Sequence, residues 1–170
     1  SKNGVDVTFV ARGQHLEHMK KYGLKIDSHW GNFLVKSRFT DSLENIKKAD
    51  LIIQATKLYS NSSALPLLKP VIGTNTVILT IQNGISSGEI ISEYYDWEKV
   101  LQGATYIETE IIDPGYIQQT GSVAMIEFGE KDGKISDRCL RVKDRLDVDG
   151  IQVNISKDIA STLWIKMVSV

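Results

Sequence analysis

The stretch Thr76-Val-Ile-Leu-Thr-Ile-Gln-Asn-Gly84 decides the fold of this chain. Its first six residues are apolar or β-branched without alternation, which is typical of a strand buried on both faces of a parallel sheet. Two amides and a glycine then break the apolar run. Ligands of open α/β sheets bind just beyond the carboxyl ends of the strands. We therefore expect Asn83 to hydrogen-bond a ligand there, beside a turn that Gly84 permits. A tight Asn-Gly turn without a function is the alternative.

Working outward from this stretch, strands alternate with helices at first, and a run of strands follows. This order predicts an α/β fold, a Rossmann-like doubly wound sheet with an antiparallel extension. The expected strands are residues 5–10, 24–27, 33–39, 51–56, 76–81, 100–107, 110–113, 116–120, 123–128 and 151–154. The expected helices are residues 15–22, 41–48, 60–68, 86–95, 135–146 and a last helix capped by Ser156 or Asp158. One candidate domain boundary lies near Ser156.

Length and charge narrow the class of protein. The chain has 170 residues, which suits one domain or one and a fraction, and a net charge of −1. A charge near zero argues against a nucleic-acid or membrane-surface partner. No apolar run reaches the ~20 residues that span a bilayer, and we expect no signal peptide. The single cysteine, Cys139, excludes an intrachain disulfide and fits a reducing cytoplasm. We expect it to pack inside a helix.

Both ends of the chain predict that it is part of a larger protein. The first expected strand begins after only four residues, and the apolar helix at residues 163–170 ends without a cap. A helix that is apolar all round is buried, and no residue of this chain follows Val170 to bury it. We therefore expect the chain to be incomplete at both ends.

Two basic residues follow expected strands. Arg12 stands after the strand at residues 5–10, where an acidic residue binds the ribose of NAD and an arginine accommodates the 2′-phosphate of NADP. Its guanidinium group can bind phosphate through two parallel hydrogen bonds. Lys57 ends the strand at residues 51–56, where a lysine can neutralise a phosphate or position a nicotinamide ribose. For both residues, a solvated loop position is the alternative.

Lys166 lies on the last expected helix, in a stripe with Ile159, Leu163 and Val170. A lysine in an apolar stripe is partly desolvated, which lowers its pKa and readies it to give up a proton near neutral pH. The alternative is a lysine at the helix surface whose amine stays in water.

Other chemistry has weaker signals. His15 and His18 are three apart on one expected helix, but no third metal ligand is evident, so we expect a solvated helix face and no metal site. The sequence has no Gly-x-Ser-x-Gly motif and no Cys-x-x-Cys pair. It also has no Gly-x-Gly-x-x-Gly loop, the feature that a dinucleotide-binding fold most needs.

Several short stretches occur in an order that is hard to obtain by chance. They are Asp6-Val-Thr-Phe-Val-Ala-Arg-Gly13, Ile53-Gln-Ala-Thr-Lys57, Thr80-Ile-Gln-Asn-Gly84, Gln102-Gly-Ala-Thr-Tyr106, Gln119-Thr-Gly121 and Leu163-Trp-Ile-Lys166. Together they resemble the ketopantoate reductase (2-dehydropantoate 2-reductase) family over essentially the whole chain.

The resemblance implies an oxidoreductase that uses NADPH to reduce a small 2-keto acid, 2-dehydropantoate foremost, as family members often do in pantothenate biosynthesis. Lys166 would be the catalytic proton donor and would bind the substrate together with Asn83. Arg12, Lys57 and Asn83 would bind NADP. The resemblance leaves a homodimer open as the assembly.

The resemblance also implies a domain division. Residues 1–155 would form the NADP-binding Rossmann-like domain without its first strand and glycine-rich loop. Residues 156–170 would begin an all-helical second domain, and the chain alone would be inactive. Two further readings stay open. One is a related dehydrogenase for another 2-keto or 2-hydroxy acid, because Val170 stands where the family usually has a substrate-binding asparagine. The other is a non-catalytic NADP-binding sensor.

Overall fold

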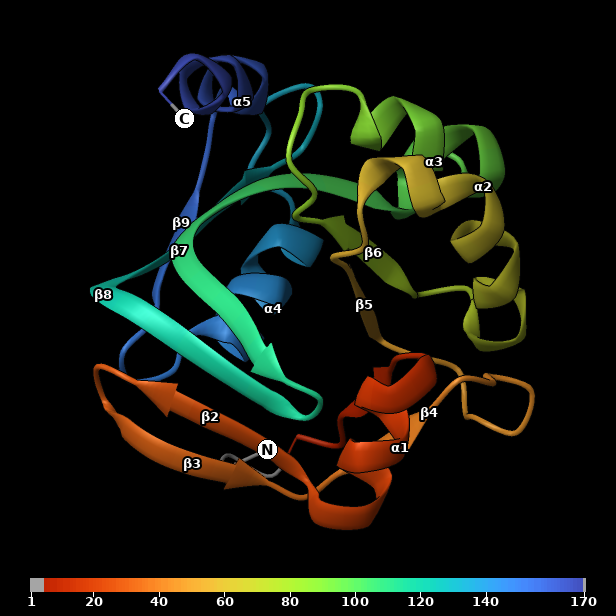
Figure 1. The fold of residues 1–170 in the computed structure, drawn as a ribbon. Helices are drawn as coiled ribbons and strands as arrows, with labels where there is room; N and C mark the ends of the chain where they lie inside the picture. Colours follow the sequence, from red (N-terminus) through yellow and green to blue (C-terminus); the bar gives the residue numbers. More distant parts are fainter. Residues whose placement is uncertain (1–4, 170) are drawn as a thin grey trace. The chain divides into compact units, whose positions relative to one another are not determined.

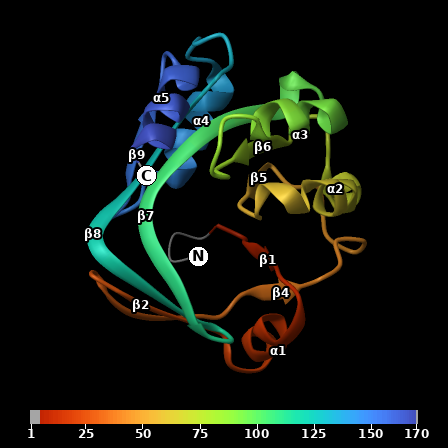
Figure 2. The same ribbon diagram turned by 45° about the horizontal axis from the view of Figure 1, so that its top comes forward.

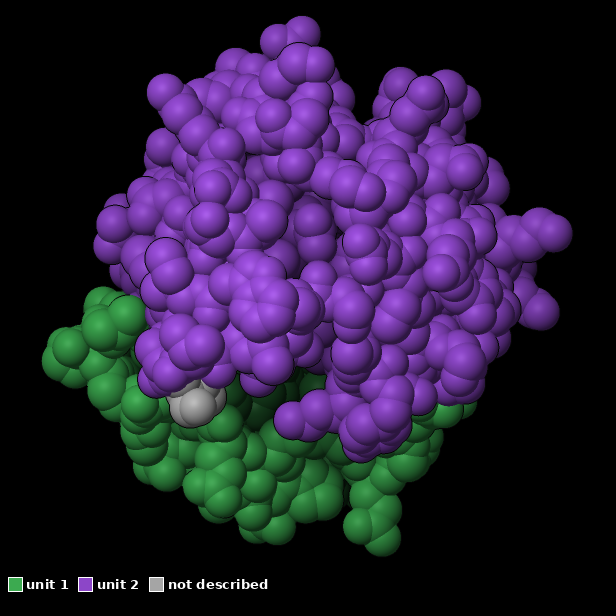
Figure 3. Space-filling view, turned by 90° about the horizontal axis from the view of Figure 1, so that it is seen from above, with its two compact units in different colours: residues 1–43, 107–123 green, residues 44–106, 124–170 purple. Residues whose placement is uncertain are grey.

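The computed structural model describes residues 5–169 and divides into two compact units, coloured separately in Figure 3. Unit 1 comprises residues 1–43 and 107–123, and unit 2 comprises residues 44–106 and 124–170. Two long strands, β7 (Val100–Asp113) and β8 (Tyr116–Gly129), contribute residues to both units.

Unit 2 is built on parallel strands (Figure 1). β5 (Leu51–Gln54) pairs in parallel with β6 (Val77–Thr80), and β6 pairs in parallel with the start of β7. β8 lies next to β7 in the sheet and pairs in parallel with β9 (Gln152–Ile155). All four residues of β6 are buried, which confirms that the stretch at residues 76–84 supplies a central strand. β5 is less enclosed, since Ile53 is 46% exposed.

Helices connect and cover these strands. They are the 3₁₀ turn η1 (Leu58–Ser60), α2 (Asn61–Ala64), the 3₁₀ segment η2 (Leu65–Val71), α3 (Ser87–Tyr95), the 3₁₀ turn η3 (Trp97–Lys99), α4 (Asp137–Leu146) and α5 (Ile159–Val168). Helix α4 buries Cys139 and Val142 in the core formed by β6, β7 and β8, as expected for the cysteine. None of the helices in residues 5–169 has the length and apolar content needed to cross a bilayer.

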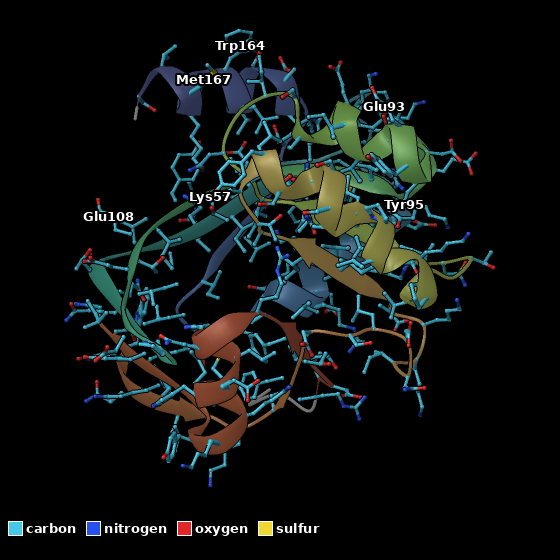
Figure 4. All side chains as sticks on the ribbon, turned by 45° about the vertical axis from the view of Figure 1, so that its right-hand side comes forward. Lys57, Glu93, Tyr95, Glu108, Trp164 and Met167 are labelled. Carbon is cyan, nitrogen blue, oxygen red and sulfur yellow. The ribbon has the colours of Figure 1, made fainter. Side chains whose placement is uncertain are left out.

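Helix α5 is apolar on more than one face. Asp158 caps its N-terminus by accepting a hydrogen bond of 3.0 Å from the backbone of Ser161. Ile159 and Leu163 are buried. The side chains of Trp164 and Met167 lie on the same helix and are about half exposed (Figure 4). Packing within unit 2 therefore fixes one face of α5, and the other face lies on the surface of the described residues.

Unit 1 joins a helix to two small groups of strands. β1 (Thr8–Val10) and β4 (Arg38–Thr40) pair in parallel and lie beside α1 (Gly13–Tyr22) in Figure 2. β2 (Leu24–Ser28) and β3 (Gly31–Val35) form the predicted hairpin, and β2 also pairs in parallel with residues 116–118 of β8. The core consists of Leu16, Met19, Leu24 and Phe39.

Several local expectations were wrong, although the predicted mixed α/β fold is confirmed. Residues 33–39 are not one strand, because the chain leaves the hairpin at Val35 and β4 then pairs with β1. Residues 41–48 do not form a helix. The Oγ1 atom of Thr40 instead accepts a hydrogen bond of 3.0 Å from the backbone amide of Ser42. This bond forms a local turn, which is an alternative to starting a helix at residue 41 or 42.

Other boundaries moved because tertiary pairing outweighs local signals. The expected helix at residues 60–68 is reduced to α2, and the 3₁₀ segment η2 follows it with Pro66 near its start. The strands expected at residues 100–107 and 110–113 are one strand, β7. Those expected at residues 116–120 and 123–128 are likewise continuous as β8.

Candidate active site

Lys166 and Asn83 meet at the carboxyl end of β6. The Nζ atom of Lys166 donates a hydrogen bond of 3.0 Å to Oδ1 of Asn83, 83 residues earlier in the chain. The buried side chains of Ile159 and Leu163 on α5 form a cluster with Ala104 of β7, against which Ile85 also packs. This packing explains the meeting, because Ile85 lies two residues after Asn83 and the cluster holds α5 beside that loop.

The amine of Lys166 lies in a partly apolar environment. The side chain is half-buried, and its Nζ atom lies 5.5 Å from the centroid of the Tyr106 ring. Burial lowers the pKa of Lys166 below its ordinary value. Within residues 5–169, no carboxylate forms an ion pair with this amine. A lysine whose close partners are neutral, and whose proton is held less tightly, can both attract an anionic ligand and release a proton.

The turn after β6 presents Asn83 to solvent. Asn83 is exposed, and Gly84 has a φ of +106°, a value that side chains rarely adopt. No atom lies within 4 Å of the position that a Cβ of Gly84 would occupy. The glycine is therefore required by the backbone conformation and not by crowding, as the Asn-Gly pattern predicts.

Lys57 is exposed in the loop that follows β5 (Figure 4). Its backbone carbonyl accepts a hydrogen bond of 2.9 Å from the amide of Ser60, which starts the turn η1. β5 and β6 are parallel neighbours, with Gln54 opposite Thr80. The loops that carry Lys57 and Asn83 therefore leave the same edge of the sheet.

Arg12 belongs to unit 1. It is exposed, follows β1 and immediately precedes α1. The neighbouring Ala11 donates its backbone hydrogen bond to the carbonyl of Thr40, at 3.0 Å, which extends the pairing of β1 with β4. The structure thus places Arg12 after a strand, as the sequence predicts, and its part in a site with residues of unit 2 stays a prediction.

The two histidines do not form a solvated face. His15 and His18 are half-buried, and Nδ1 of His15 accepts a hydrogen bond of 3.0 Å from the backbone of Gly115. The Nδ1 atom of His18 is buried without a hydrogen-bond partner among the described residues. Both side chains pack against the turn of the β7–β8 hairpin within unit 1. Nowhere in residues 5–169 do three or more His, Cys, Asp or Glu side chains gather as metal ligands would.

Behind the exposed site residues lies a group that the sequence analysis missed. Gln54, Asn61 and Gln82 are buried amides joined by hydrogen bonds, and we call them the amide cluster. A signal for them existed, because Gln54 and Gln82 are polar residues at the ends of apolar strand sequences. No local pattern marks Asn61, which the fold brings to them from α2.

A parallel sheet with lysine and asparagine side chains at its carboxyl edge places the chain among Rossmann-like α/β proteins. The family described as ketopantoate reductase PanE/ApbA matches residues 1–133. The chain therefore belongs to the ketopantoate reductase family. Lys166 lies outside the residues of that match.

Individual relatives extend the similarity along the chain. A 2-dehydropantoate 2-reductase of Archaeoglobus fulgidus is 32% identical over 165 residues, which cover 97% of this chain and 53% of the relative. The crystal structure of 2-dehydropantoate 2-reductase from Geobacter metallireducens GS-15 superposes with a TM-score of 0.90 at 25% identity, covering 99% of this chain and 56% of that one.

A more distant enzyme has the same fold. D-mandelate dehydrogenase, solved with NADH and anilino(oxo)acetate, superposes with a TM-score of 0.86 at 22% identity, over 97% of this chain and 54% of that one. The chain spans about half the length of the curated relatives that it matches.

Proposed function

We propose that the protein is an NADPH-dependent reductase of 2-keto acids, with 2-dehydropantoate as its foremost substrate and Lys166 as its proton donor. The observation that carries this proposal is the 3.0 Å hydrogen bond between the half-buried amine of Lys166 and the exposed amide of Asn83. Membership of the ketopantoate reductase family and the name of the Archaeoglobus relative support the reaction class.

The chemistry of three proposed site residues fits a dinucleotide phosphate. Arg12 would grip the 2′-phosphate through its planar guanidinium group, Lys57 would neutralise phosphate charge, and Asn83 would hydrogen-bond the nicotinamide ribose. Neither Arg12 nor Lys57 forms an ion pair within residues 5–169, so both cations have donors to offer. When bound, NADPH supplies the hydride that adds to the carbonyl carbon of the keto acid.

Lys166 would complete the reduction at the carbonyl oxygen. As the carbonyl π bond opens, its electron pair moves to oxygen, and the ammonium group of Lys166 gives up a proton to form the hydroxyl. The N–H bond breaks, the amine is left neutral, and a proton from solvent restores it. Its lowered pKa favours this transfer. Before transfer, the charged amine would attract the substrate carboxylate, while Asn83 orients the amine and contacts the substrate.

The remaining assignments follow from the same proposal. Residues 1–155 would form the NADP-binding domain, and residues 156–170, which carry Lys166, would begin a helical domain. The net charge of −1 gives no reason to assign a nucleic-acid partner. A cytoplasmic location belongs to the same proposal, because a single cysteine fits a reducing compartment.

A second candidate is a related dehydrogenase for another 2-keto or 2-hydroxy acid. The fold shared with D-mandelate dehydrogenase favours it, as does Val170 in place of the family's usual asparagine. Val170 lies outside the described residues. The third reading, a sensor that binds NADPH without catalysis, has no comparable observation in its favour.

The test uses the protein at its natural full length. NADPH oxidation would be followed with 2-dehydropantoate and a panel of aliphatic and aromatic 2-keto acids. Turnover of 2-dehydropantoate with the highest kcat/KM is the expected result. A higher kcat/KM for another acid would favour the related dehydrogenase, and NADPH binding without any turnover would overturn the enzymatic proposal in favour of the sensor.

A further inference from the structure

Three primary amides are buried where β5 and β6 end. Gln54, Asn61 and Gln82 are 4%, 2% and 4% exposed, respectively. They come from three separate elements, namely β5, α2 and the segment after β6. A buried amide is costly unless its hydrogen bonds are made, so each of these groups depends on partners held in place nearby.

The two central amides bind each other in both directions. The Nδ2 atom of Asn61 donates to Oε1 of Gln82 at 3.0 Å, and Nε2 of Gln82 donates to Oδ1 of Asn61 at 2.8 Å. A reciprocal pair of this kind fixes the orientation of both amide planes, because each plane carries one donor and one acceptor to the other.

Further bonds connect this pair to the loop after β5. The Nε2 atom of Gln82 lies 2.6 Å from the backbone oxygen of Thr56 and 3.2 Å from its Oγ1 atom. Gln54 donates to the same Oγ1 atom at 2.8 Å and to Oδ1 of Asn61 at 3.2 Å. The hydroxyl of Thr80 adds a contact of 3.4 Å to Oε1 of Gln82. Gln82 is therefore the centre of the cluster.

The residues held in this way are the immediate neighbours of two proposed site residues. Thr56 precedes Lys57, and Gln82 precedes Asn83. Lys57 and Asn83 are themselves exposed, so packing around their side chains cannot fix them. We propose that Asn61 and Gln82 are positioning residues, whose paired amides fix the loop of Lys57 relative to the loop of Asn83. This proposal rests on the proposed function, because it assigns the cluster to the site where the nucleotide and keto acid would bind.

Directional bonds suit this role better than apolar packing. At residues 77–79 of β6 the side chains are apolar, so beyond the backbone pairing with β5 and β7 they add packing that has no preferred direction. Hydrogen bonds lose strength steeply with angle and distance, so a closed set of them defines one loop geometry. A misplacement of about 1 Å at a reacting centre can reduce the rate roughly 100-fold.

The test compares Asn61→Leu with Thr76→Val in the full-length protein. Thr76 is 3% exposed and lies at the opposite end of β6. Its Oγ1 atom accepts a hydrogen bond of 2.8 Å from the backbone amide of Gly73 and donates one of 2.6 Å to the backbone carbonyl of Ala49. Each variant thus removes a buried hydrogen-bonding side chain that lies beside one end of β6. At a temperature where circular dichroism shows both to be folded, Asn61→Leu should lower kcat/KM roughly 10- to 100-fold, and Thr76→Val less than about threefold.

A second pair of measurements separates positioning from folding. Amide hydrogen exchange without ligand should accelerate at residues 56–61 and 82–85 in Asn61→Leu, and not in Thr76→Val. The double variant Asn61→Gln with Gln82→Asn keeps two facing amides of the same combined length. It should recover a large part of the kcat/KM lost in the single variant Asn61→Gln.

The outcomes distinguish this proposal from the proposed function. Wild-type protein that reduces no keto acid would overturn the proposed function, and the exchange comparison would still decide whether the cluster fixes the two loops. Active wild type together with an Asn61→Leu variant that matches Thr76→Val in kcat/KM would overturn the positioning role. Faster exchange with unchanged kcat/KM would do the same, because the cluster would then serve folding alone.

Discussion

Two cationic side chains of unit 2, Arg138 and Lys166, differ in how their charge is partnered. The Nε atom of Arg138 donates to Oε1 of Glu130 at 2.6 Å, and its Nη2 atom donates to Oε2. The same guanidinium group donates to backbone carbonyls of Trp97 and Val100, each at 3.2 Å, and to that of Glu98. Lys166, in contrast, has the neutral amide of Asn83 as its hydrogen-bond partner.

The surroundings of Glu130 complete the contrast. Burial raises the pKa of Glu130. Hydrogen bonds from Arg138 and Ser136, together with the positive charge of Arg138, lower it by more than burial raises it, so the pKa of Glu130 lies below its ordinary value. The side chains of the pair are only 17% and 12% exposed. The guanidinium group of Arg138 is bonded to a carboxylate and three carbonyls, and these bonds hold α4 against the start of β7. The close partners of the Lys166 amine are neutral, so its charge remains available to a ligand.

The largest expected effect is on catalysis by Lys166. Replacing it by Met removes the amine while keeping an unbranched side chain on α5, so we expect kcat to fall roughly 10²- to 10⁴-fold, the usual worth of a general acid. Steady-state kinetics with the preferred keto acid measures this. The exposed Lys157, near the start of the same helix, gives the control Lys157→Met, which should keep wild-type turnover. Equal kcat in Lys166→Met and Lys157→Met would show that the amine of Lys166 has no part in catalysis.

Arg138→Leu tests the other side of the comparison. Breaking a buried ion pair from one side leaves Glu130 without its partner, which should cost about 3–5 kcal/mol of unfolding free energy. Urea unfolding measures this change. Lys134→Met, which breaks the exposed pair with Asp132, is the control and should leave the unfolding midpoint nearly unchanged. A loss of turnover in Arg138→Leu protein that is still fully folded would mean that the pair also serves the site.

The same pair predicts a dependence of stability on pH. Because the folded pKa of Glu130 is depressed, its contribution is present above the unfolded pKa and is lost as the pH falls through the folded pKa. Wild-type protein should therefore lose more unfolding free energy than Arg138→Leu between neutral and acidic pH. Parallel curves for the two proteins would show that the Glu130 carboxylate contributes nothing specific.

The candidate site residues Asn83, Lys57 and Lys166 could be singled out from the sequence, whereas the buried amides behind them were missed. Asn83 and Lys57 follow apolar strands, and Lys166 interrupts an apolar helical stripe, so each is visible as a break in a local pattern. The hydrogen bond between Lys166 and Asn83 was not visible in this way, because it depends on the packing of Ile159 and Leu163.

Buried polar groups were missed because their partners are distant in sequence. Arg138 meets carbonyls about 40 residues earlier, and Asn61 meets Gln82 21 residues later. From the neighbouring sequence alone, Arg138 and Asn61 are both typical of surface residues. The fold class was predicted correctly because it depends on the order of strands and helices, which does not change when the predicted ends of an element are wrong. The missed β1–β4 pairing and the false helix at residues 41–48 show that a local pattern does not reveal which strand pairs with which.

Arg12 gives a smaller test of the idea that a free cation serves a ligand. It is exposed, and within residues 5–169 no ion pair engages it. Hydrogen bonds between charged groups are worth about 1.5–3 kcal/mol, so Arg12→Ser should reduce the preference for NADPH over NADH roughly 10- to 100-fold. The ratio of the two kcat/KM values measures this, with the exposed Arg141→Ser on α4 as control. An unchanged ratio would exclude Arg12 from recognition of the 2′-phosphate.

The pH dependence of kcat/KM, compared between wild type and Lys166→Arg, tests the central claim most directly. The reactive lysine is the protonated form, so wild-type kcat/KM should be level at lower pH and fall about tenfold per pH unit above the pKa of Lys166, which burial places below its ordinary value. Arginine keeps the charge but does not release its proton, so Lys166→Arg should retain substrate binding, turn over slowly and show no such decline. A Lys166→Arg variant with wild-type turnover and the wild-type profile would contradict the claim that this amine supplies the proton.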